Sequence, residues 1–278
     1  MPPRSGRRIA LTIAGSDPGG GAGIQADLKV FAALGVYGYS ALTAVIAQNS
    51  SAVERVQAIA PAMVSAQIEI VTAEKMPGAI KTGALTNAAI VRAVARTVGE
   101  LKLPAPVVDP VMVSSAGARL LDRAGERAIR HYLVPLARVI TPNLAEAEAL
   151  THLRIDGASA IRQAAREILA MGARAVVIKG GHRRERDESG QSIDLLYDGR
   201  NYVELRATRI AGDGAHGTGC AFSAAIAASL ARGMDLEASV RAAKRYITAA
   251  LRLRFRLGSG RAILDHFARR TPPGDAAF

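Results

Sequence analysis

Short apolar runs alternate with longer amphipathic segments along most of the chain. Uninterrupted apolar runs such as AVVIK are typical of strands that are buried on both faces of a sheet. The predicted strands are Ile9–Ala14, Tyr39–Ala47, Ala79–Thr82, Val107–Val108, Val139–Ile140, Ala175–Lys179, Asp194–Tyr197 and Tyr202–Leu205. The predicted helices are Gly23–Leu34, Pro61–Ala73, Asn87–Val98, Asp122–Leu133, Leu144–Thr151, Ala158–Met171, Gly219–Ala231, Leu236–Leu251 and Ile263–Ala268.

This alternation predicts an α/β fold with a mostly parallel central sheet and helices on both of its faces. The segment SIDLLYDGRNYVELR differs, because Asp198-Gly199 is a strong hairpin signal between two strands. We therefore expect an antiparallel hairpin at one edge of the sheet. No repeat or linker divides the chain, so a single domain over residues 1–278 is expected, and the polar stretch Gly181–Gln191 is predicted to be a mobile loop.

Composition excludes several classes of protein. Of the 278 residues, 49% are hydrophobic and 22% are charged, which is typical of a globular chain and excludes intrinsic disorder. A single cysteine excludes an intramolecular disulfide framework and a four-cysteine metal site. No apolar run reaches 18 residues, and the apolar stretch Ile9–Ala14 is too short for a signal peptide, so we expect a cytoplasmic protein without a membrane partner.

The net charge of +12 suggests anionic partners, which include nucleic acids, membrane surfaces and anionic metabolites. The basic residues are scattered, however, and their densest runs are Arg183–Arg186 and the alternating Arg252, Arg254 and Arg256. Aromatic residues make up only 4% of the chain, too few for a base-stacking platform beside those runs. We therefore expect an arginine-rich solvated surface and no nucleic-acid partner.

The first glycine-rich segment, Gly15–Lys29, follows a predicted strand and opens a helix. Its GAGIQA stretch formally fits the dinucleotide-binding pattern, but Ala47-Gln48-Asn49 stands where that pattern requires an acidic residue. Two alternatives remain open. The segment is either a tight turn without a ligand, or a place where a small ligand approaches bare backbone amides beside the carboxylate of Asp17 or Asp27.

The second glycine-rich segment, Ala211–Ala231, joins a polar loop to an apolar helix of small residues. Gly217-Thr218-Gly219-Cys220 stands at the start of that helix, where backbone amides without helical partners and the helix dipole favour an anion. The same position predicts a lowered pKa for the Cys220 thiol. The alternative is a buried and inert cysteine.

Three further polar groups are expected at strand ends. Asp109 ends a strand before Pro110, where it can bind Mg²⁺, orient a phosphate or simply form a turn. Asn143 and Glu146 are three residues apart at a helix start, which fits either a shared site or a capping box. Lys179 ends another strand and suits a phosphate ligand, unless it is merely solvated.

Motifs of other enzyme classes are missing. The chain has no H-E-x-x-H, no G-x-S-x-G and no G-x-x-x-x-G-K-[ST], which argues against zinc hydrolysis, serine acyl transfer and P-loop nucleotide binding. Its five histidines show no ligand spacing.

Taken together, in this order and spacing, these segments resemble the hydroxymethylpyrimidine/phosphomethylpyrimidine kinases of thiamine biosynthesis, within the ribokinase-like superfamily. The likeness extends from about Ile9 to His266, and its most specific pieces are IAGSDPGGGAGIQADLK, TAVIAQNS, DPVM, TPNLAEAEAL and HGTGC. It implies a ribokinase-like fold, ATP and Mg²⁺, and phosphorylation of the hydroxymethylpyrimidine and then of its monophosphate. Dimers are common among such relatives, so a homodimer is expected.

The resemblance also implies roles for individual positions. It puts the ATP phosphates at Gly217, Thr218 and Gly219 and at the ammonium of Lys179, with Asn143 near them and Glu146 and Asp109 as ligands of Mg²⁺. Cys220 occupies the place of the aspartate base of sugar kinases, and with Lys179 it completes the expected catalytic set. Gln48 is the expected reader of the pyrimidine, through a ring nitrogen and the neighbouring amino group. The other expected pocket residues are Ala22, Asp27, Ala84, Asp109 and Val111.

Some positions depart from the family's pattern. Ala84 stands where the family usually has methionine, which removes a pocket wall and can admit a larger ring. Ala215 replaces a usual threonine, and Ala262 and Ile263 are less typical of the C-terminal segment. A pyridoxal or pyridoxine kinase and a non-catalytic pyrimidine-binding protein therefore stay open as alternatives.

Overall fold

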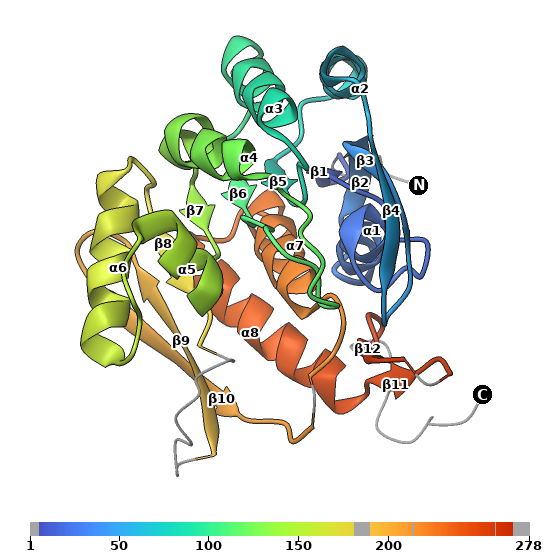
Figure 1. The fold of residues 1–278 in the computed structure, drawn as a ribbon. Coiled ribbons are helices and arrows are strands. Elements are labelled where there is room, and N and C mark those ends of the chain that lie inside the picture. Colours follow the sequence, from blue (N-terminus) through green and yellow to red (C-terminus); the bar gives the residue numbers. More distant parts are fainter. Residues whose placement is uncertain (1–5, 181–189, 213, 259, 269–278) are drawn as a thin grey trace.

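The computed structural model describes residues 6–180, 190–212, 214–258 and 260–268. Its central feature is an eight-stranded sheet with the strand order β10-β9-β8-β7-β6-β5-β1-β2 (Figure 1). All neighbours from β8 to β2 are parallel, whereas β9 and β10 are antiparallel. This confirms the predicted architecture. The strands are β1 Ile9–Ala14, β2 Tyr37–Leu42, β5 Ala79–Thr82, β6 Val107–Val108, β7 Val139–Ile140, β8 Val176–Ile178, β9 Gln191–Tyr197 and β10 Tyr202–Thr208.

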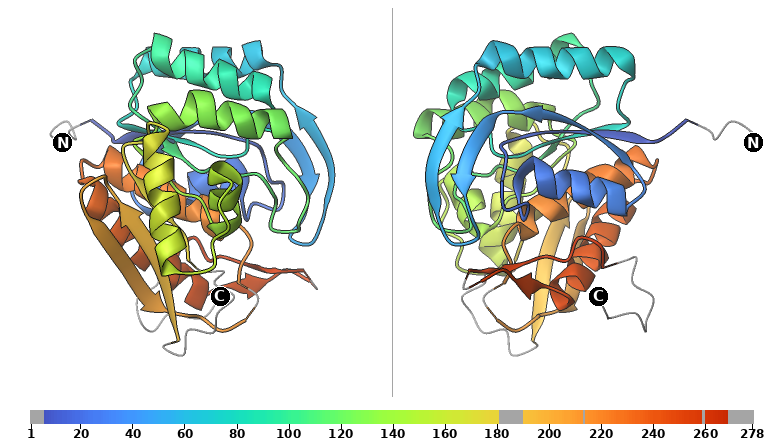
Figure 2. Two further views of the ribbon diagram at one scale, coloured as in Figure 1. Left: turned by 60° about the vertical axis from the view of Figure 1, so that its left-hand side comes forward. Right: turned by 90° about the vertical axis from the view of Figure 1, so that its right-hand side faces the viewer.

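Helices cover both faces of this sheet, and each face has its own apolar core (Figure 2). One core includes α1 (Gly23–Ala33), α7 (Thr218–Ala231) and α8 (Leu236–Arg252). The other core includes α2 Pro61–Glu74, α3 Ala88–Glu100, α4 Arg123–Ala128, α5 Leu144–Thr151 and α6 Ala158–Ala170. α4 continues into a π-helical turn over Ile129–Leu133 and a 3-10 turn over Val134–Leu136.

The predicted strand Tyr39–Ala47 is wrong, because the chain leaves the central sheet in the middle of it. At Thr43 the hydroxyl donates to the carbonyl oxygen of Ala84 at 2.7 Å, and the two halves of the segment belong to different sheets. The second half is β3 (Ala44–Gln48), which pairs with β4 (Val53–Ala58), a strand that the sequence analysis did not predict. The two strands form a hairpin that curves along one side of the molecule (Figure 2).

The predicted helix Ile263–Ala268 is also wrong. Residues 262–264 are three consecutive buried positions, a pattern that does not follow the period of a helix. Instead, β11 (Phe255–Arg256) and β12 (Ala262–Ile263) form a small antiparallel pair, and Ile263 makes a parallel bridge to His216. Residues 181–189 of the predicted polar loop lie outside the described residues, and its last residue, Gln191, begins β9.

The predicted hairpin at Asp198-Gly199 joins β9 and β10. The Asp198 carboxylate accepts hydrogen bonds from the backbone N–H groups of Arg200 and Asn201 at 2.9 and 2.7 Å. Gly199 has a φ of +91°, which a residue without a Cβ adopts at little cost. Elsewhere in the fold, none of the helices over the described residues is both long and apolar enough to cross a membrane.

Candidate functional site

The polar groups named from the sequence gather at one edge of the sheet. Because β1, β5, β6, β7 and β8 are parallel, their carboxyl ends meet at the same edge, where open α/β sheets bind ligands. Asp109 follows β6, and Lys179 follows β8. The N-terminus of α7 reaches the same place, since a Cβ added to Gly219 would lie 3.1 Å from Nζ of Lys179 and 3.9 Å from Oδ2 of Asp109. The polar residues expected at strand ends therefore lie together, and their role in binding a ligand stays a prediction.

The turn that begins α7 has the geometry predicted for an anion-binding turn. Its N-cap, Gly217, has a φ of +81°, and a Cβ at this position would lie 1.7 Å from the carbonyl oxygen of Gly21. Only glycine fits there. The Thr218 hydroxyl donates to the carbonyl oxygen of Ala215 at 2.8 Å, which fixes the start of the helix. The N–H groups of the first turn have no acceptor inside the helix, so they and the helix dipole favour a bound anion.

Lys179 adds a positive charge to this turn. Its Nζ lies 3.2 Å from Oδ1 of Asp109 and 4.0 Å from Oε2 of Glu146. A Cβ on Gly219 would come within 3.1 Å of the same Nζ, so the ammonium group lies against the first turn of α7. An anion at that turn would meet the backbone amides and the ammonium group together.

Asp109 is held rigidly in this cluster. Its carboxylate is 2% exposed and accepts a hydrogen bond from the Ser223 hydroxyl at 3.2 Å in addition to its contact with Lys179. Thr141, at the end of β7, lies 3.5 Å from the same carboxylate. Ser223 could not be predicted from the sequence, because a serine inside a small-residue helix carries no signal that it faces a carboxylate 114 residues away.

Asn143 and Glu146 form the capping box that the sequence left as an alternative. The Asn143 side chain accepts from the Glu146 N–H at 2.9 Å, and the Glu146 carboxylate accepts from the Asn143 N–H at 2.8 Å. The same carboxylate oxygen is the one near Lys179. Burial raises the pKa of Glu146 to about 7, because the nearby Lys179 ammonium only partly offsets it and the charge of Asp109 adds to it.

The donor set here suits a magnesium ion that arrives with phosphates. Within the described parts of the chain, no group of three or more His, Cys, Asp or Glu side chains is arranged to hold a metal. Two carboxylates, Asp109 and Glu146, nevertheless converge on Lys179. Mg²⁺ commonly binds through one or two carboxylates, water and substrate phosphates, so these two side chains fit that mode.

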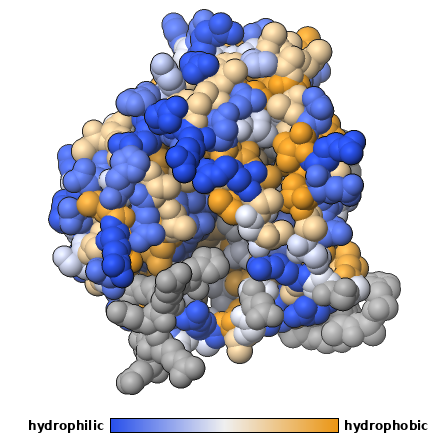
Figure 3. Space-filling model, in the orientation of Figure 1, coloured by the Kyte–Doolittle hydropathy of each residue, from blue (hydrophilic) through white to orange (hydrophobic). Residues whose placement is uncertain are grey.

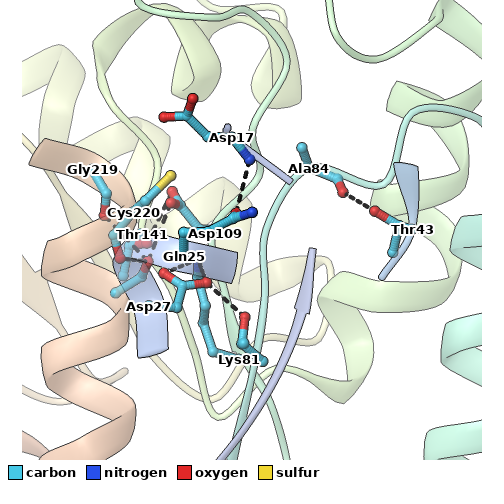
Figure 4. A network of polar contacts seen from close by, with 12 residues as sticks. Asp17, Gln25, Asp27, Thr43, Lys81, Ala84, Asp109, Thr141, Gly219 and Cys220 are labelled. Carbon is cyan, nitrogen blue, oxygen red and sulfur yellow. Dashed lines mark hydrogen bonds and ion pairs between the residues drawn. The ribbon is translucent and has the colours of Figure 1, made fainter. Parts of the chain in front are cut away.

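A fully buried ion pair lies beneath the start of α7. Nζ of Lys81 is 2.6 and 2.8 Å from the two carboxylate oxygens of Asp27, and the Thr12 hydroxyl donates to Asp27 at 2.6 Å. Figure 4 shows this pair together with Asp109 and Cys220. Asp27 has no exposed surface, so it can contact a ligand only by leaving Lys81. Lys81 was missed, although a charged residue inside the apolar strand AIKT is an available signal.

The predicted lowering of the Cys220 pKa is wrong. Burial raises the pKa of this thiol to about 11, and the carboxylates of Asp109 and Asp27 add to the effect. The Lys81 ammonium and the Gly23 N–H act in the opposite direction but do not compensate. The thiol of Cys220 is therefore protonated at neutral pH. A position at a helix N-terminus does not by itself set the charge of a half-buried cysteine.

An apolar cluster lies on the other side of the edge. Ala84 packs there with Ala44, Ile46 and Leu120, and the half-buried Val111 lies against them. Gln48 ends β3 at a point where the pairing with β4 is irregular. Figure 3 shows apolar side chains on the part of the surface where Figure 1 draws β3 and β4. The predicted pocket residues Ala84 and Val111 are thus together, and Gln48 lies on the same hairpin as Ile46.

Asp17 organises the first glycine-rich loop. Its carboxylate accepts hydrogen bonds from the N–H groups of Gly19, Gly21 and Ala22 at 2.7–3.1 Å, and its own N–H donates to Gln25 (Figure 4). Burial opposes ionisation, but hydrogen bonds from His216 and Gln48 outweigh it and hold the pKa of Asp17 at about 2. The predicted pocket residue Ala22 is therefore part of an ordered loop, and Gln48 reaches that loop from β3.

His216 is a further residue that the sequence analysis missed. Its Nε2 lies 2.8 Å from Asp17, and its Nδ1 lies 3.1 Å from the hydroxyl of Ser115. These partners are 199 and 101 residues away in the sequence. No local spacing can reveal such a contact.

A family model for phosphomethylpyrimidine kinase matches residues 17–265, which is most of the chain and includes all the site residues predicted from the sequence. The chain belongs to the phosphomethylpyrimidine kinase family. It is 47% identical over 259 residues to the hydroxymethylpyrimidine/phosphomethylpyrimidine kinase of Synechococcus elongatus, covering 93% of this chain and 97% of that protein.

The chain is also similar to a second relative and to a solved structure. A thiamine biosynthesis bifunctional protein of Geobacter sulfurreducens is 44% identical over 260 residues, and this chain spans about half (52%) of its length. Among solved structures, an ADP complex of Bacillus subtilis pyridoxal kinase is 39% identical with a TM-score of 0.87. That match covers 95% of this chain and 99% of that one.

Proposed function

We propose that this protein transfers the γ-phosphoryl group of ATP to the hydroxymethyl group of 4-amino-5-hydroxymethyl-2-methylpyrimidine, and then phosphorylates the resulting monophosphate to the diphosphate in thiamine biosynthesis. One observation carries the proposal: the anion-binding turn of α7, with Lys179 against it, lies at the same sheet edge as the apolar cluster around Ala84. The 47% identity to a kinase named for these two substrates supports the choice of acceptor.

On the nucleotide side, the amides of Gly217, Thr218 and Gly219 and the ammonium of Lys179 bind the ATP phosphates. Phosphoryl transfer has a loose transition state, so positioning and charge neutralisation supply most of the rate. The first turn of α7 and Lys179 provide both, because they meet at one point.

Asp109 and Glu146 would hold Mg²⁺ when the nucleotide binds, and the ion would supply neutralisation of the phosphate charge. Asn143 fixes Glu146 through the capping box, so its role in the metal site is indirect. Lys179 lies between the two carboxylates and holds them in place before the ion arrives.

On the acceptor side, the carboxamide of Gln48 pairs with a ring nitrogen and the amino group of the pyrimidine, since it offers both an acceptor and donors. Val111 and Ala84 supply apolar contact with the ring. The backbone near Ala22 borders the same pocket, and Asp27 supports it from beneath through its pair with Lys81.

Cys220 lies in the first turn of α7 beside Asp109 (Figure 4). In the enzyme without ligands its thiol is protonated at neutral pH, so the thiol is not in the form that could take the proton of the hydroxymethyl group. We assign it to the catalytic set as a neighbour of the reacting hydroxyl. Proton removal late in the reaction contributes less to the rate than charge neutralisation does.

The test is ADP release with Mg-ATP and three acceptors: hydroxymethylpyrimidine, its monophosphate and pyridoxal. Turnover of both pyrimidines with slow pyridoxal turnover is the expected result. Absence of ADP release with every acceptor would contradict an enzyme and leave a pyrimidine-binding protein. A Gln48→Ala variant should lose pyrimidine turnover while its affinity for ADP stays the same.

Pyridoxal kinase is the second candidate. It is favoured by the TM-score of 0.87 to a pyridoxal kinase and by the small side chain of Ala84 in the apolar cluster. Pyridoxal kinase ranks second because the identity to the pyrimidine kinase is higher, 47% against 39%. Turnover of pyridoxal alone in the same assay would reverse this order.

We also propose that the protein is a cytoplasmic homodimer. ATP is a cytoplasmic metabolite, and α2 carries the exposed apolar side chains of Met63 and Ile70, which are 56% and 70% exposed. Light scattering on a sizing column should give about twice the chain mass of 29.0 kDa. A mass equal to one chain would refute the dimer.

A further inference from the structure

Three loops meet at His216, which is 5% exposed. Its Nε2 contacts Asp17 in the loop between β1 and α1, at 2.8 Å. Its Nδ1 contacts Ser115 in the segment that follows β6, at 3.1 Å. Its backbone N–H donates to Ala262 at the start of β12, and the next residue, Gly217, is the N-cap of α7. His216 therefore joins the first glycine-rich loop to the anion-binding turn.

The hydrogen-bond network fixes the role of Nε2 in the ring of His216. The Asp17 carboxylate, whose other partners are three backbone N–H groups and the side chain of Gln48, can only accept, so Nε2 of His216 carries a proton and donates. With a neutral ring, Nδ1 accepts from the hydroxyl of Ser115. Neither contact requires a charged imidazole.

The same two loops also interlock sterically. A Cβ on Gly21 would lie 2.7 Å from Cδ2 of His216, and a Cβ on Gly217 would lie 1.7 Å from the carbonyl oxygen of Gly21. Backbone therefore packs against backbone and against the imidazole ring without free space. A shift of either loop must move the other.

We propose that Asp17 and His216 are positioning residues that couple the two ligand sites, so that occupation of the acceptor pocket raises the affinity for nucleotide and the reverse. The inference rests on the proposed function, which puts the acceptor beside Ala22 and the phosphates at Gly217. Asp17 orders the first loop through its three N–H contacts, and His216 transmits that order to the α7 turn. Linkage requires the two affinities to change by the same factor.

The experiment is calorimetric titration of the unmodified protein with hydroxymethylpyrimidine, with and without the non-hydrolysable analogue AMP-PCP. We expect the analogue to raise the pyrimidine affinity at least about 5-fold, the lower end of usual coupling. In His216→Ala, each ligand should still bind alone within about 3-fold, while the coupling falls to about 1. In kinetic assays, the variant should show raised KM values for both substrates.

Three variants make the test specific. His216→Gln keeps an N–H donor for Asp17 and should restore part of the coupling, which a merely structural role would not require. Ser115→Ala removes only the contact of Ser115 with Nδ1 of His216, and it should keep most of the coupling. Asp17→Asn weakens the same contact with His216 from the other loop. If His216→Ala does not fold, Asp17→Asn shows whether this contact couples the two ligand sites.

The outcomes separate this inference from the proposed function. If the unmodified protein turns over the pyrimidine but the coupling is the same in His216→Ala and Asp17→Asn, the positioning role is refuted and the function stands. If it turns over pyridoxal alone, the function is corrected and the coupling is measured with pyridoxal. An unmodified protein that binds both ligands without any mutual effect would also refute the inference.

Discussion

The two sides of the site differ in how firmly their residues are held. On the proposed nucleotide side, Asp109 has three side-chain partners, and Gly217 permits no other residue. On the acceptor side, Ala84 and Val111 belong to a small apolar cluster beside a hairpin with the exposed residues Val45 and Val56. We infer that the type of reaction depends on the rigid side, whereas the choice of acceptor depends on a few side chains that can be exchanged.

Gly217→Ala should have the largest effect, because the added Cβ would overlap the carbonyl oxygen of Gly21 and displace the α7 turn. We expect kcat/KM for ADP release to fall about 10³-fold or more. Gly233→Ala is the matched control, since Gly233 also has a positive φ, +89°, but open space around it. Equal losses in both variants would mean that backbone strain, and not the contact with Gly21, is the cause.

Lys179→Met removes the cation from the α7 turn and leaves the buried Asp109 without its ammonium partner. We expect kcat/KM to fall about 10²-fold while binding of the pyrimidine alone, measured by calorimetry, hardly changes. Lys75→Met, at the exposed end of α2 before β5, is the control and should be neutral. A comparable loss of pyrimidine affinity in Lys179→Met would show that the two sides are not separable.

Ala84→Met tests the exchangeable side. The larger side chain fills space next to Val111, so the ratio of pyridoxal to pyrimidine turnover should fall about 10-fold while the KM for ATP stays constant. Ala73→Met, at an exposed position of α2, controls for the substitution itself. An unchanged ratio would mean that Ala84 does not border the acceptor ring.

Cys220→Ser should retain activity within about 10-fold, because a thiol with a pKa of about 11 contributes little as a base at neutral pH. ADP release under saturating substrates is the measurement, and ADP affinity serves as the check that the α7 turn is intact. A complete loss of turnover with normal ADP affinity would make proton removal by Cys220 the dominant step.

Glu146→Gln tests stability instead of activity, and its effect depends on pH. The folded pKa of about 7 is above the ordinary value of 4.5, so the folded state holds an extra proton. The free energy of unfolding is therefore highest below pH 4.5, and it falls by about 3 kcal/mol as the pH rises through 7. Glutamine keeps the capping contact without titrating, so urea unfolding at pH 5 and pH 8 should differ less in the variant. The same pH dependence in both proteins would contradict the raised pKa.

Local patterns were sufficient for much of the fold. Apolar runs located the strands of the central sheet within a few residues, and Asp198-Gly199 gave the hairpin at its edge. They did not show that the chain leaves the sheet at Thr43, because β3 continues the apolar run of β2 without a break. The chain turns out of the sheet where Thr43 contacts Ala84, which is 41 residues away in the sequence. A pattern read from neighbouring residues does not include that contact.

The site divides in the same way. Asp109, Lys179 and the α7 turn could be named because strand ends and helix starts have local signatures. The pairs Asp27–Lys81 and Asp17–His216 could not, since each joins distant parts of the chain. The charge of Cys220 was misjudged for a related reason: it is the sum of burial and of several distant charges, and the helix N-terminus is only one of them.

The reversal of strand direction between β8 and β9 has a practical consequence. Tyr197 pairs with Val176 at the start of β8, so the turn over residues 198–201 lies at the end of the sheet away from the strand ends that carry the chemistry. Its residues Gly199, Arg200 and Asn201 are exposed. A peptide tag or a fluorescent label inserted there would report on the enzyme, or anchor it to a surface, without reaching the ligands.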